Sequence, residues 1–351
     1  MRATMTKRER VLRTIALQET DRVPVYDIFS QDGAIEIFAG EPVTVENGLE
    51  VACRAIRKAF DMTRMVRGPS APGISINKMG LPVRQERWTA WLEERPWRDE
   101  PGAREWLKSL LESVEAWQPT PEYVEEFRQG LLLRHALIGD GTVIVVESGV
   151  GLTEIYHALG LEMFSYVLAD DPELVVAALE ARNQAELRRV AAIADPELIP
   201  VALTYDDVAY KGGTLLSPAW LRREWIPRLK RLNDAWHERG TKCLFHSDGN
   251  LMAILPDLVA AGIDGLNPVE VAAGMSLREV KRLYGDRIFL TGGIDVSQLM
   301  AYGTEDEVRA ACRQAIADAG PTGYFLGSTT ELHPGVRPRN VVAMVETARG
   351  R

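Results

Sequence analysis

The sequence has few cysteines, no long basic run and no long apolar run. Its three cysteines, Cys53, Cys243 and Cys312, are odd in number and lack the spacing of a metal site, so we expect reduced thiols in the cytoplasm. The net charge of −9 argues against nucleic-acid binding. No stretch reaches the roughly 18–20 apolar residues that cross a bilayer, and the first residues lack the pattern of a secretory signal peptide. We therefore expect a protein that binds neither nucleic acid nor membrane.

Common nucleotide-binding and hydrolase motifs are missing as well. The sequence has no phosphate-cradling P-loop and no Ser-centred nucleophile elbow. Gly149-Val150-Gly151 lacks the remaining glycine of a dinucleotide-binding fingerprint. This absence counts against an open, doubly wound sheet, which is the alternative architecture for a chain of alternating strands and helices.

Eight apolar segments, each followed by a helical pattern, organise the chain. This alternation predicts an α/β fold, a (β/α)8 TIM barrel formed as a single domain by residues 1–351. A capping box at Thr6-Lys7-Arg8-Glu9 predicts an additional N-terminal helix, and alternating residues around Gly80-Leu81-Pro82 predict a small β-hairpin insertion. The expected strands span residues 22–29, 62–67, 142–148, 199–204, 241–246, 263–270, 287–291 and 323–328.

Most of these expected strands have a polar residue at their carboxyl end. His246 follows the apolar run Cys243-Leu244-Phe245, and Asp248 comes two positions later. The carboxyl ends of parallel strands meet at one mouth of a barrel, where acids require solvent, a cation or a catalytic role. The polar residues at the expected strand ends are Asp27, Glu147, Asp206, Asp207, His246, Asp248, Glu270, Asp295 and Ser328.

Three uses of this group are chemically reasonable. Imidazole and carboxylates suit Zn²⁺, Fe²⁺ or Mn²⁺, and the natural ligands are His246, Asp248, Glu147 and Glu270. Crowded carboxylates could instead serve as general acids and bases, or they could bind a cationic or polyhydroxylated substrate. Structural alternatives stay open: a hydrogen-bonded core histidine for His246, a bond to a loop N–H for Glu270, and a turn before a helix for Asp206-Asp207.

Aromatic residues and a further histidine are candidates for substrate binding. Trp88, Trp91 and Trp97 could cover a pocket for a flat substrate, although the packing of a small satellite sheet is the favoured alternative. Tyr205 follows an expected strand directly. His333 lies in a loop expected at the barrel mouth, where it could reach the site.

Several segments, spread over nearly the whole chain, carry a family resemblance: residues 5–12 with 21–25, Phe245-His246-Ser247-Asp248-Gly249-Asn250, residues 261–270, Gly292-Gly293-Ile294-Asp295, and residues 336–344. In order and spacing they resemble the uroporphyrinogen decarboxylase superfamily. The resemblance implies an eight-stranded β/α barrel with its site at the C-terminal mouth, in agreement with the strand count.

The sequence departs from two well-defined groups of that superfamily. True uroporphyrinogen decarboxylases carry an Arg-Gln-Ala-Gly-Arg segment after the first strand, where this chain has Phe29-Ser30-Gln31-Asp32-Gly33-Ala34. Without those arginines, a net-acidic mouth would repel a tetrapyrrole with many carboxylates. Methyltransferases of the coenzyme M type hold zinc through a His-x-Cys pair and a later Cys. Here Asp248 replaces the first of these cysteines and none lies near Ser328, so a zinc-thiolate is not supported.

The resemblance then implies a corrinoid-dependent methyltransferase. It would move a methyl group from a small methylated donor, with an aromatic methyl ether favoured, to a corrinoid held by a separate partner protein, and zinc is a candidate metal. In this interpretation the catalytic residues are His246, Glu270, Asp206 and Glu147, the substrate-binding residues are Tyr205, Asp207, Trp88, Trp91 and His333, and the metal ligands are His246, Asp248 and Glu270.

Two other functions stay open. A metal-independent decarboxylase or lyase of a small carboxylic acid would need a basic pocket, for which Arg64, Arg67, Arg337 and Arg339 are candidates. A non-catalytic binding subunit is the third class. It would be favoured if replacing His246 and Glu270 by alanine left ligand affinity and all turnover unchanged.

Overall fold

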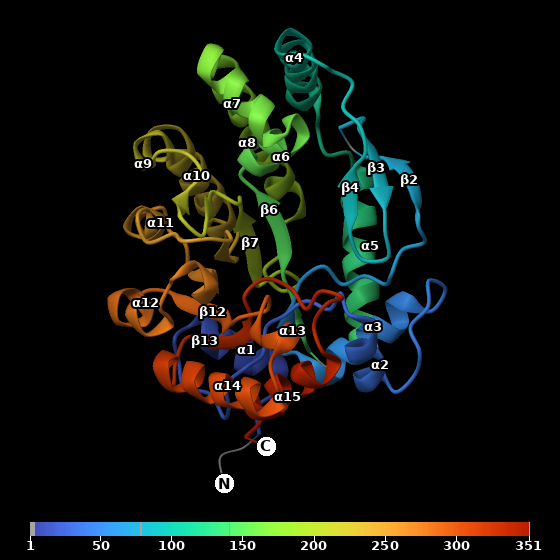
Figure 1. Cartoon of the computed structure of the whole chain (residues 1–351), viewed down its shortest axis with the longest axis vertical. Helices are drawn as coiled ribbons and strands as arrows, with labels where there is room; N and C mark the ends of the chain where they lie inside the picture. Colours follow the sequence, from blue (N-terminus) through green and yellow to red (C-terminus); the bar gives the residue numbers. More distant parts are fainter. Residues whose placement is uncertain (1–3, 78, 140, 351) are drawn as a thin grey trace.

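Six parallel strands form the continuous part of the sheet. The computed structural model describes residues 4–77, 79–139 and 141–350. Within these ranges the strand order is β13-β12-β11-β10-β7-β6, so strands that follow one another in the chain are neighbours in the sheet (Figure 1). The strands are β6 (Val146–Gly149), β7 (Val201–Tyr205), β10 (Lys242–His246), β11 (Gly265–Val269), β12 (Phe289–Ile294) and β13 (Tyr324–Ser328).

Two further strand positions close this sheet into a barrel. β5 (Val143–Ile144) leads directly into β6 and pairs in parallel with β1 (Met62–Thr63). Tyr26 bridges to Met62 in β1, and Val25 bridges to Leu326 in β13, both in parallel. The Tyr26 N–H donates to the Leu326 carbonyl at 3.0 Å, and the Met62 N–H donates to the Val25 carbonyl at 3.1 Å. The predicted eight-stranded β/α barrel is therefore confirmed.

Helices follow the strands and begin where the sequence supplies caps. The N–H of Glu9 donates to Oγ1 of Thr6 at 3.2 Å, which starts the predicted N-terminal helix α1 (Lys7–Ile15). Thr304 and Glu307 cap α14 (Glu305–Ala319) reciprocally. Among the described residues, none of the helices combines the length and the apolar character needed to cross a lipid bilayer.

The helices differ in where they lie along the barrel. In Figure 1, α1 and α15 lie near one end of the molecule, and α4 and α7 project at the opposite end. The remaining helices are α2 (Asp32–Ala39), α3 (Gly48–Ala59), α4 (Glu100–Ala116), α5 (Pro121–Ile138), α6 (Leu152–Leu159), α7 (Leu161–Asp170), α8 (Pro172–Ile193), α9 (Pro218–Trp220), α10 (Ile226–His237), α11 (Leu255–Ala260), α12 (Leu277–Tyr284), α13 (Leu299–Tyr302) and α15 (Pro338–Ala348).

The insertion after β1 contains a third strand in addition to the predicted hairpin. β2 (Gly73–Ile76), β3 (Pro82–Gln85) and β4 (Ala90–Leu92) form an antiparallel sheet in that order. The third strand exists because the chain turns back after β3, where the N–H of Glu86 donates to the carbonyl of Thr89 at 2.8 Å. A two-residue pair, β8 (Ala209–Tyr210) with β9 (Gly213–Thr214), follows β7.

Alternate side chains along the strands fill the barrel lumen with apolar groups. Successive residues of a strand point to opposite faces, so every second residue faces the lumen. α1 contributes Val11 and Ile15 to this cluster and so covers the amino-terminal end of the barrel. The cluster also contains Tyr26, Met62, Val143, Val145, Val201, Leu203, Leu244, Phe289 and Phe325.

Candidate functional site

At the carboxyl ends of the strands, the lumen side chains become polar. The alternation continues from Met62 to Arg64, from Val145 to Glu147, from Leu203 to Tyr205, from Leu244 to His246 and from Phe289 to Thr291. Tyr205 and His246 are direct register partners in the adjacent strands β7 and β10. A polar layer therefore covers the apolar lumen at the mouth where α/β barrels carry their chemistry.

His246 is buried, oriented and neutral. Its Nδ1–H donates to Oδ1 of Asn267 at 2.6 Å, and Nδ2 of Asn267 donates to Oγ1 of Thr291 at 2.5 Å. Nε2 therefore carries the lone pair, and it lies 3.7 Å from Oδ1 of Asp207. Burial, and then the positive charge of Arg64, lower the pKa of His246 below its usual value. At neutral pH, Nε2 can accept a proton or bind a metal ion.

Two aspartates complete a cluster with His246. The Asp248 N–H donates to Oδ1 of Asp207 at 3.1 Å, which ties the loop after β10 to the loop after β7. Oδ1 of Asp248 is buried and has no hydrogen-bond partner within the described residues. Burial, and then the charges of Asp207 and Glu270, raise the pKa of Asp248 to about 7. A bound ligand or a proton would give this buried oxygen at the barrel mouth a partner.

This cluster of Asp207, His246 and Asp248 fits a metal ion. One ligand atom from each residue lies within 4.8 Å of the other two. One imidazole nitrogen with two carboxylate oxygens suits Zn²⁺, Fe²⁺ or Mn²⁺, and three protein ligands leave a coordination position for a substrate. The unpaired Asp248 oxygen supports the fit, because a cation would satisfy it.

Glu270 lies near this cluster, but its carboxylate accepts a hydrogen bond from a backbone N–H. Its Oε2 accepts the N–H of Gly249 at 2.5 Å, as one of the two sequence interpretations expected. Gly249 has a φ of +92°, and an added Cβ would collide with the backbone of β8, so the loop requires glycine here. Among the described residues, the cluster of potential ligand atoms contains Asp207 with His246 and Asp248, and Glu270, a predicted ligand, lies outside it.

Asp206 faces away from the cluster, contrary to the catalytic role expected for it. Its carboxylate accepts the N–H groups of Leu152 at 3.0 Å and Thr153 at 2.7 Å, at the start of α6, and the Nε1–H of Trp225 at 2.8 Å. Burial raises the pKa of Asp206 to about 6, against these hydrogen bonds. Of the adjacent pair Asp206-Asp207, the first caps a helix and the second reaches the site, a division that sequence alone could not make.

Glu147 and Arg64 form an ion pair within the polar layer. Nη1 of Arg64 lies 2.6 Å from Oε1 of Glu147. Arg64 is only 8% exposed, and its Nε has no hydrogen-bond partner in the part of the chain that the structure describes. The methyltransferase interpretation gave Arg64 no role, although the alternation from Met62 signals that its side chain faces the lumen.

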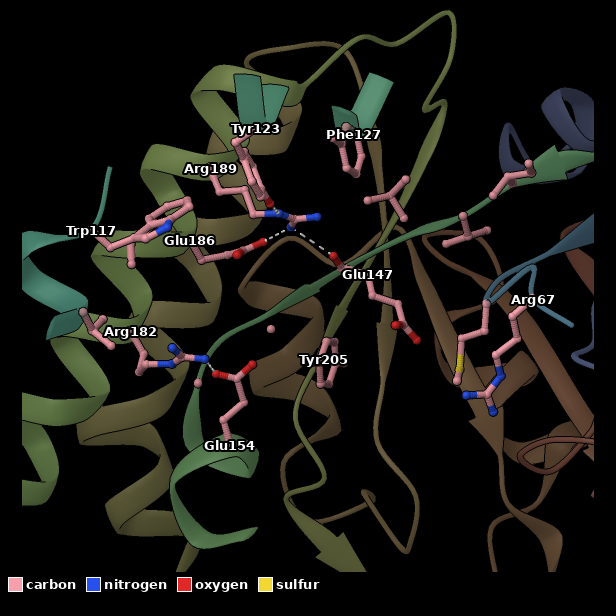
Figure 2. Close-up of a pocket in the computed structure, with 18 of the residues that line it drawn as sticks. Arg67, Trp117, Tyr123, Phe127, Glu147, Glu154, Arg182, Glu186, Arg189 and Tyr205 are labelled. Atoms are coloured by element: carbon pink, nitrogen blue, oxygen red, sulfur yellow. Dashed lines mark hydrogen bonds and ion pairs between the residues drawn. The ribbon is translucent and has the colours of Figure 1, made fainter. Parts of the chain in front are cut away.

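A cavity of about 940 Å³ adjoins the polar layer, with Glu147 and Tyr205 in its wall. In Figure 2, Arg189 and Glu186 lie on one side, Arg67 lies on the other, and Glu147 and Tyr205 lie between them. Arg189 donates to Oε1 of Glu186 at 2.6 Å, and its guanidinium lies 5.5 Å from the ring centre of Phe127. The other labelled lining residues are Trp117, Tyr123, Glu154 and Arg182.

The predicted tryptophan roof is not part of this lining as the described residues define it. Trp88 is buried, and its Nε1–H donates to Oδ1 of Asp32 at 2.7 Å. Trp91 is 55% exposed on the three-stranded sheet. Trp97 packs on Trp106 with ring centres 4.5 Å apart. Trp88 and Trp97 therefore contact the helices α2 and α4, and the aromatic lining comes instead from Trp117 at the C-cap of α4, Tyr123 and Phe127 in α5, and Tyr205, most of which sequence reasoning missed.

The remaining candidates lie around the loop after β13. His333 is half-buried, and its Nδ1 accepts the N–H of Gly335 at 3.1 Å. Arg337 donates to the carbonyl of Gly303 at 3.1 Å, and Arg339 lies in the first turn of α15. Within the described chain, none of these three lines the cavity or belongs to the cluster around His246.

Comparison with known proteins agrees with this architecture. The family model described as Uroporphyrinogen decarboxylase (URO-D) matches residues 141–351, which is more than half of the chain. The protein therefore belongs to the uroporphyrinogen decarboxylase family, as the sequence motifs indicated. No functionally curated protein matches the sequence.

Solved structures share the fold at low sequence identity. A methyltransferase from Methanosarcina mazei superimposes with a TM-score of 0.72 and 17% identity, over 99% of both chains. A B12-independent methionine synthase from Shewanella sp. W3-18-1 gives a TM-score of 0.46 and 11% identity, over 94% of this chain and 98% of that one. At such identities the first likeness establishes the fold alone.

Proposed function

We propose that this protein transfers a methyl group from a small methylated donor, with an aromatic methyl ether favoured, to a corrinoid carried by a separate protein. The observation that carries the proposal is the cluster in which neutral His246 lies beside Asp207 and Asp248. Family membership and the fold shared with the Methanosarcina mazei methyltransferase support it. The adjoining cavity, of about 940 Å³, has the size of typical small-molecule sites.

The difficult step for an ether donor is the departure of the oxygen. When the methyl carbon is attacked, the electron pair of the carbon–oxygen bond stays on that oxygen. A divalent metal ion held by Nε2 of His246 with Asp207 and Asp248 would supply Lewis-acid stabilisation of this charge. His246 is prepared for the role because the side-chain oxygen Oδ1 of Asn267 accepts the proton on Nδ1 and leaves Nε2 free to bind.

Without a metal ion, Asp248 could instead serve as the general acid. Its pKa is raised to about 7, so it holds a proton near neutrality and can deliver it to the leaving oxygen. Asp207 keeps the Asp248 loop in place through the Asp248 N–H at 3.1 Å. Glu147 and Tyr205 belong to both the polar layer and the cavity wall, so a donor in the cavity would reach the cluster past them.

The test combines metal analysis with a methyl-transfer assay. We expect about one zinc per chain in the wild-type protein and its loss in His246→Ala. Incubation with methoxybenzenes and cob(I)alamin, free or on a cognate corrinoid protein, should produce the methylcobalamin spectrum only with the wild type. If no methylated donor alkylates either corrinoid, methyl transfer is not the function.

A second candidate is decarboxylation or lyase chemistry on a small carboxylic acid. Arg64 favours it, because a buried guanidinium whose Nε has no hydrogen-bond partner among the described residues is suited to a carboxylate. Release of CO₂ from small carboxylic acids, unchanged by chelators and lost in Arg64→Met, would support this reaction. Ligand affinity without any turnover, unaffected by His246→Ala, would instead indicate a binding subunit.

A further inference from the structure

Asp207 lies beyond the last paired residue of its strand. β7 ends at Tyr205, which is the last residue in register with both β6 and β10. The Asp206 N–H still donates to the carbonyl of His246 at 3.3 Å, whereas the sheet supplies no hydrogen bond to the backbone of Asp207 among the described residues. Other contacts must therefore set the position of the Asp207 carboxylate.

Two side chains of helix α6 bind both polar backbone groups of Asp207. The Asp207 N–H donates to Oγ1 of Thr153 at 2.7 Å, and the hydroxyl of Tyr156 donates to the Asp207 carbonyl at 2.9 Å. Thr153 and Tyr156 are three residues apart in α6, so they lie on the same helix face. Both side chains are only 7% exposed, so water has little access to replace their hydrogen bonds.

The preceding residue is attached to the same turn of α6. The Asp206 carboxylate accepts the N–H groups of Leu152 and Thr153, whereas Oδ1 of Asp207 lies 3.7 Å from Nε2 of His246. The two neighbouring carboxylates thus point in different directions. Helix α6 holds the first acid by its side chain and the second by its backbone, which leaves the second carboxylate for the cluster.

Helix α6 is itself fixed next to the site. Gly151, directly before the helix, has a φ of +123°, and a Cβ there would lie 2.6 Å from Cβ of Arg182 in α8. The Val150 N–H donates to the Tyr205 carbonyl at 3.0 Å. The start of α6 therefore packs closely on α8 and is hydrogen-bonded to the end of β7. A helix held in this way is a rigid support for a functional side chain.

We propose that Thr153 and Tyr156 are positioning residues, which hold the Asp207 carboxylate beside Nε2 of His246 in the geometry that a divalent metal ion requires. Both act through the backbone of Asp207 and not on the metal ion itself. Ligand distances in a metal site tolerate deviations of only about 0.2 Å, so a small shift of the Asp207 backbone weakens binding. The inference rests on the metal-binding part of the proposed function and identifies what orients its carboxylate ligand.

Zinc affinity, measured by competition with a chromogenic chelator, tests this inference without a methyl donor. Thr153→Val removes the acceptor of the Asp207 N–H at nearly constant side-chain volume and should weaken zinc binding about 10-fold, as is typical of groups that orient a metal ligand. Thr153→Ser keeps the hydroxyl and should bind zinc as the wild type does. Tyr156→Phe should also weaken zinc binding. In an Asp207→Ala protein, Thr153→Val should cause no further loss, because its effect is transmitted through Asp207.

Two control variants remove comparable buried hydroxyls away from the cluster. The Thr241 hydroxyl donates to the Ile199 carbonyl at 2.8 Å, and the Tyr324 hydroxyl donates to the Gly292 carbonyl at 2.8 Å. Thr241→Val and Tyr324→Phe should lower stability in urea titrations without changing zinc affinity. An equal loss of zinc affinity in these controls would show that the effect of Thr153→Val is a general loss of structure, and would overturn the inference.

The remaining outcomes separate this inference from the proposed function. Wild-type zinc affinity in the folded Thr153→Val and Tyr156→Phe proteins, a loss in Thr153→Ser as large as in Thr153→Val, or absence of zinc binding by the wild type would overturn the positioning role. Zinc binding that depends on Thr153 without methyl transfer from any donor would preserve this role and reject methyl transfer. Methyl transfer by the wild type, with a zinc affinity that Thr153→Val leaves unchanged, would do the reverse.

Discussion

The two ends of strand β10 carry clusters of similar composition. At the amino-terminal end, His237, Cys243 and Asp264 bring potential ligand atoms within 4.8 Å of one another, and at the carboxyl end Asp207, His246 and Asp248 do the same. By residue type alone, either group could hold a metal ion. Their hydrogen bonds and protonation states differ.

At the amino-terminal end, both carboxylate oxygens of Asp264 accept hydrogen bonds. One oxygen accepts from Nε2 of His237 at 2.6 Å and from the Cys243 N–H at 2.8 Å, and the other binds Nζ of Lys242 at 2.7 Å. Burial raises the pKa of the Cys243 thiol well above its usual value, so the sulfur stays protonated. This cluster ties α10, β10 and the start of β11 together, which is a structural role.

At the carboxyl end, the protein leaves groups unsatisfied. Asp248 has a buried oxygen with no partner within the described residues, and Nε2 of His246 keeps its lone pair. The comparison teaches that residue type and proximity do not distinguish a functional cluster from a structural one. The distinguishing feature is an unpaired polar atom at the barrel mouth.

The largest expected difference between the two ends is in catalysis. His246→Ala should reduce methyl transfer about 10²- to 10⁴-fold, because it removes a ligand or proton acceptor next to the reacting atoms. Bound zinc should be lost in parallel. His237→Ala is the matched control at the other end and should keep both activity and metal per folded molecule. A similar loss in both variants would contradict the functional division.

The next effect concerns the orientation of His246. Asn267→Ala should weaken metal binding about 10- to 100-fold in a chelator competition, because the partner of Nδ1 is lost and the imidazole is no longer held in one tautomer. Asn233→Ala removes a comparable buried amide, which donates to the Ala261 carbonyl near the other end, and should lower stability without changing metal affinity. Unchanged metal affinity in Asn267→Ala would reject the orienting role.

A smaller effect is expected from Asp264→Asn, on stability alone. Although burial opposes it, the hydrogen bond from His237 helps to hold the pKa of Asp264 below its usual value. The stabilisation is therefore present above the pKa of the unfolded chain and is lost as the pH falls through the folded-state pKa. The variant should lose about 1–3 kcal/mol of unfolding free energy at pH 7 in urea titrations, with a smaller deficit near pH 3. Loss of methyl transfer per folded molecule would argue for more than a structural role.

The smallest and opposite effect is expected for Asp248→Asn in protein treated with a chelator. The pKa of Asp248 is raised to about 7 in the fold, so the native state releases its proton at a higher pH than the unfolded chain does. Stability is therefore lost as the pH rises toward 7, and the neutral amide avoids this loss. At pH 8 the variant should be about 1–2 kcal/mol more stable than the wild type, and the difference should shrink at pH 5. A destabilised variant at pH 8 would show that the charged carboxylate has a partner.

Much of the fold was predictable from local patterns. Each strand is an apolar run that ends in polar or glycine residues, as in Cys243-Leu244-Phe245 followed by His246, and such runs are visible without knowledge of contacts. The prediction missed the third strand of the insertion, because the turn between Glu86 and Thr89 carries neither Gly nor Pro. It also named Trp88 as a candidate substrate-binding residue, although it favoured packing, and this side chain hydrogen-bonds Asp32 in α2.

The candidate site, like the fold, was predictable from the sequence only in part. The sequence by itself determined that acids and His246 would gather at one mouth, because strand order and the two-residue side-chain period are local properties. Only the tertiary structure decided that Asp207 rather than Asp206 or Glu270 stands beside His246. It also decided that α5 and Trp117, rather than the insertion, supply aromatic side chains to the cavity wall. These choices depend on loop conformation and helix packing between residues far apart in the chain, such as Tyr123 and Arg189, whose contact no local pattern encodes.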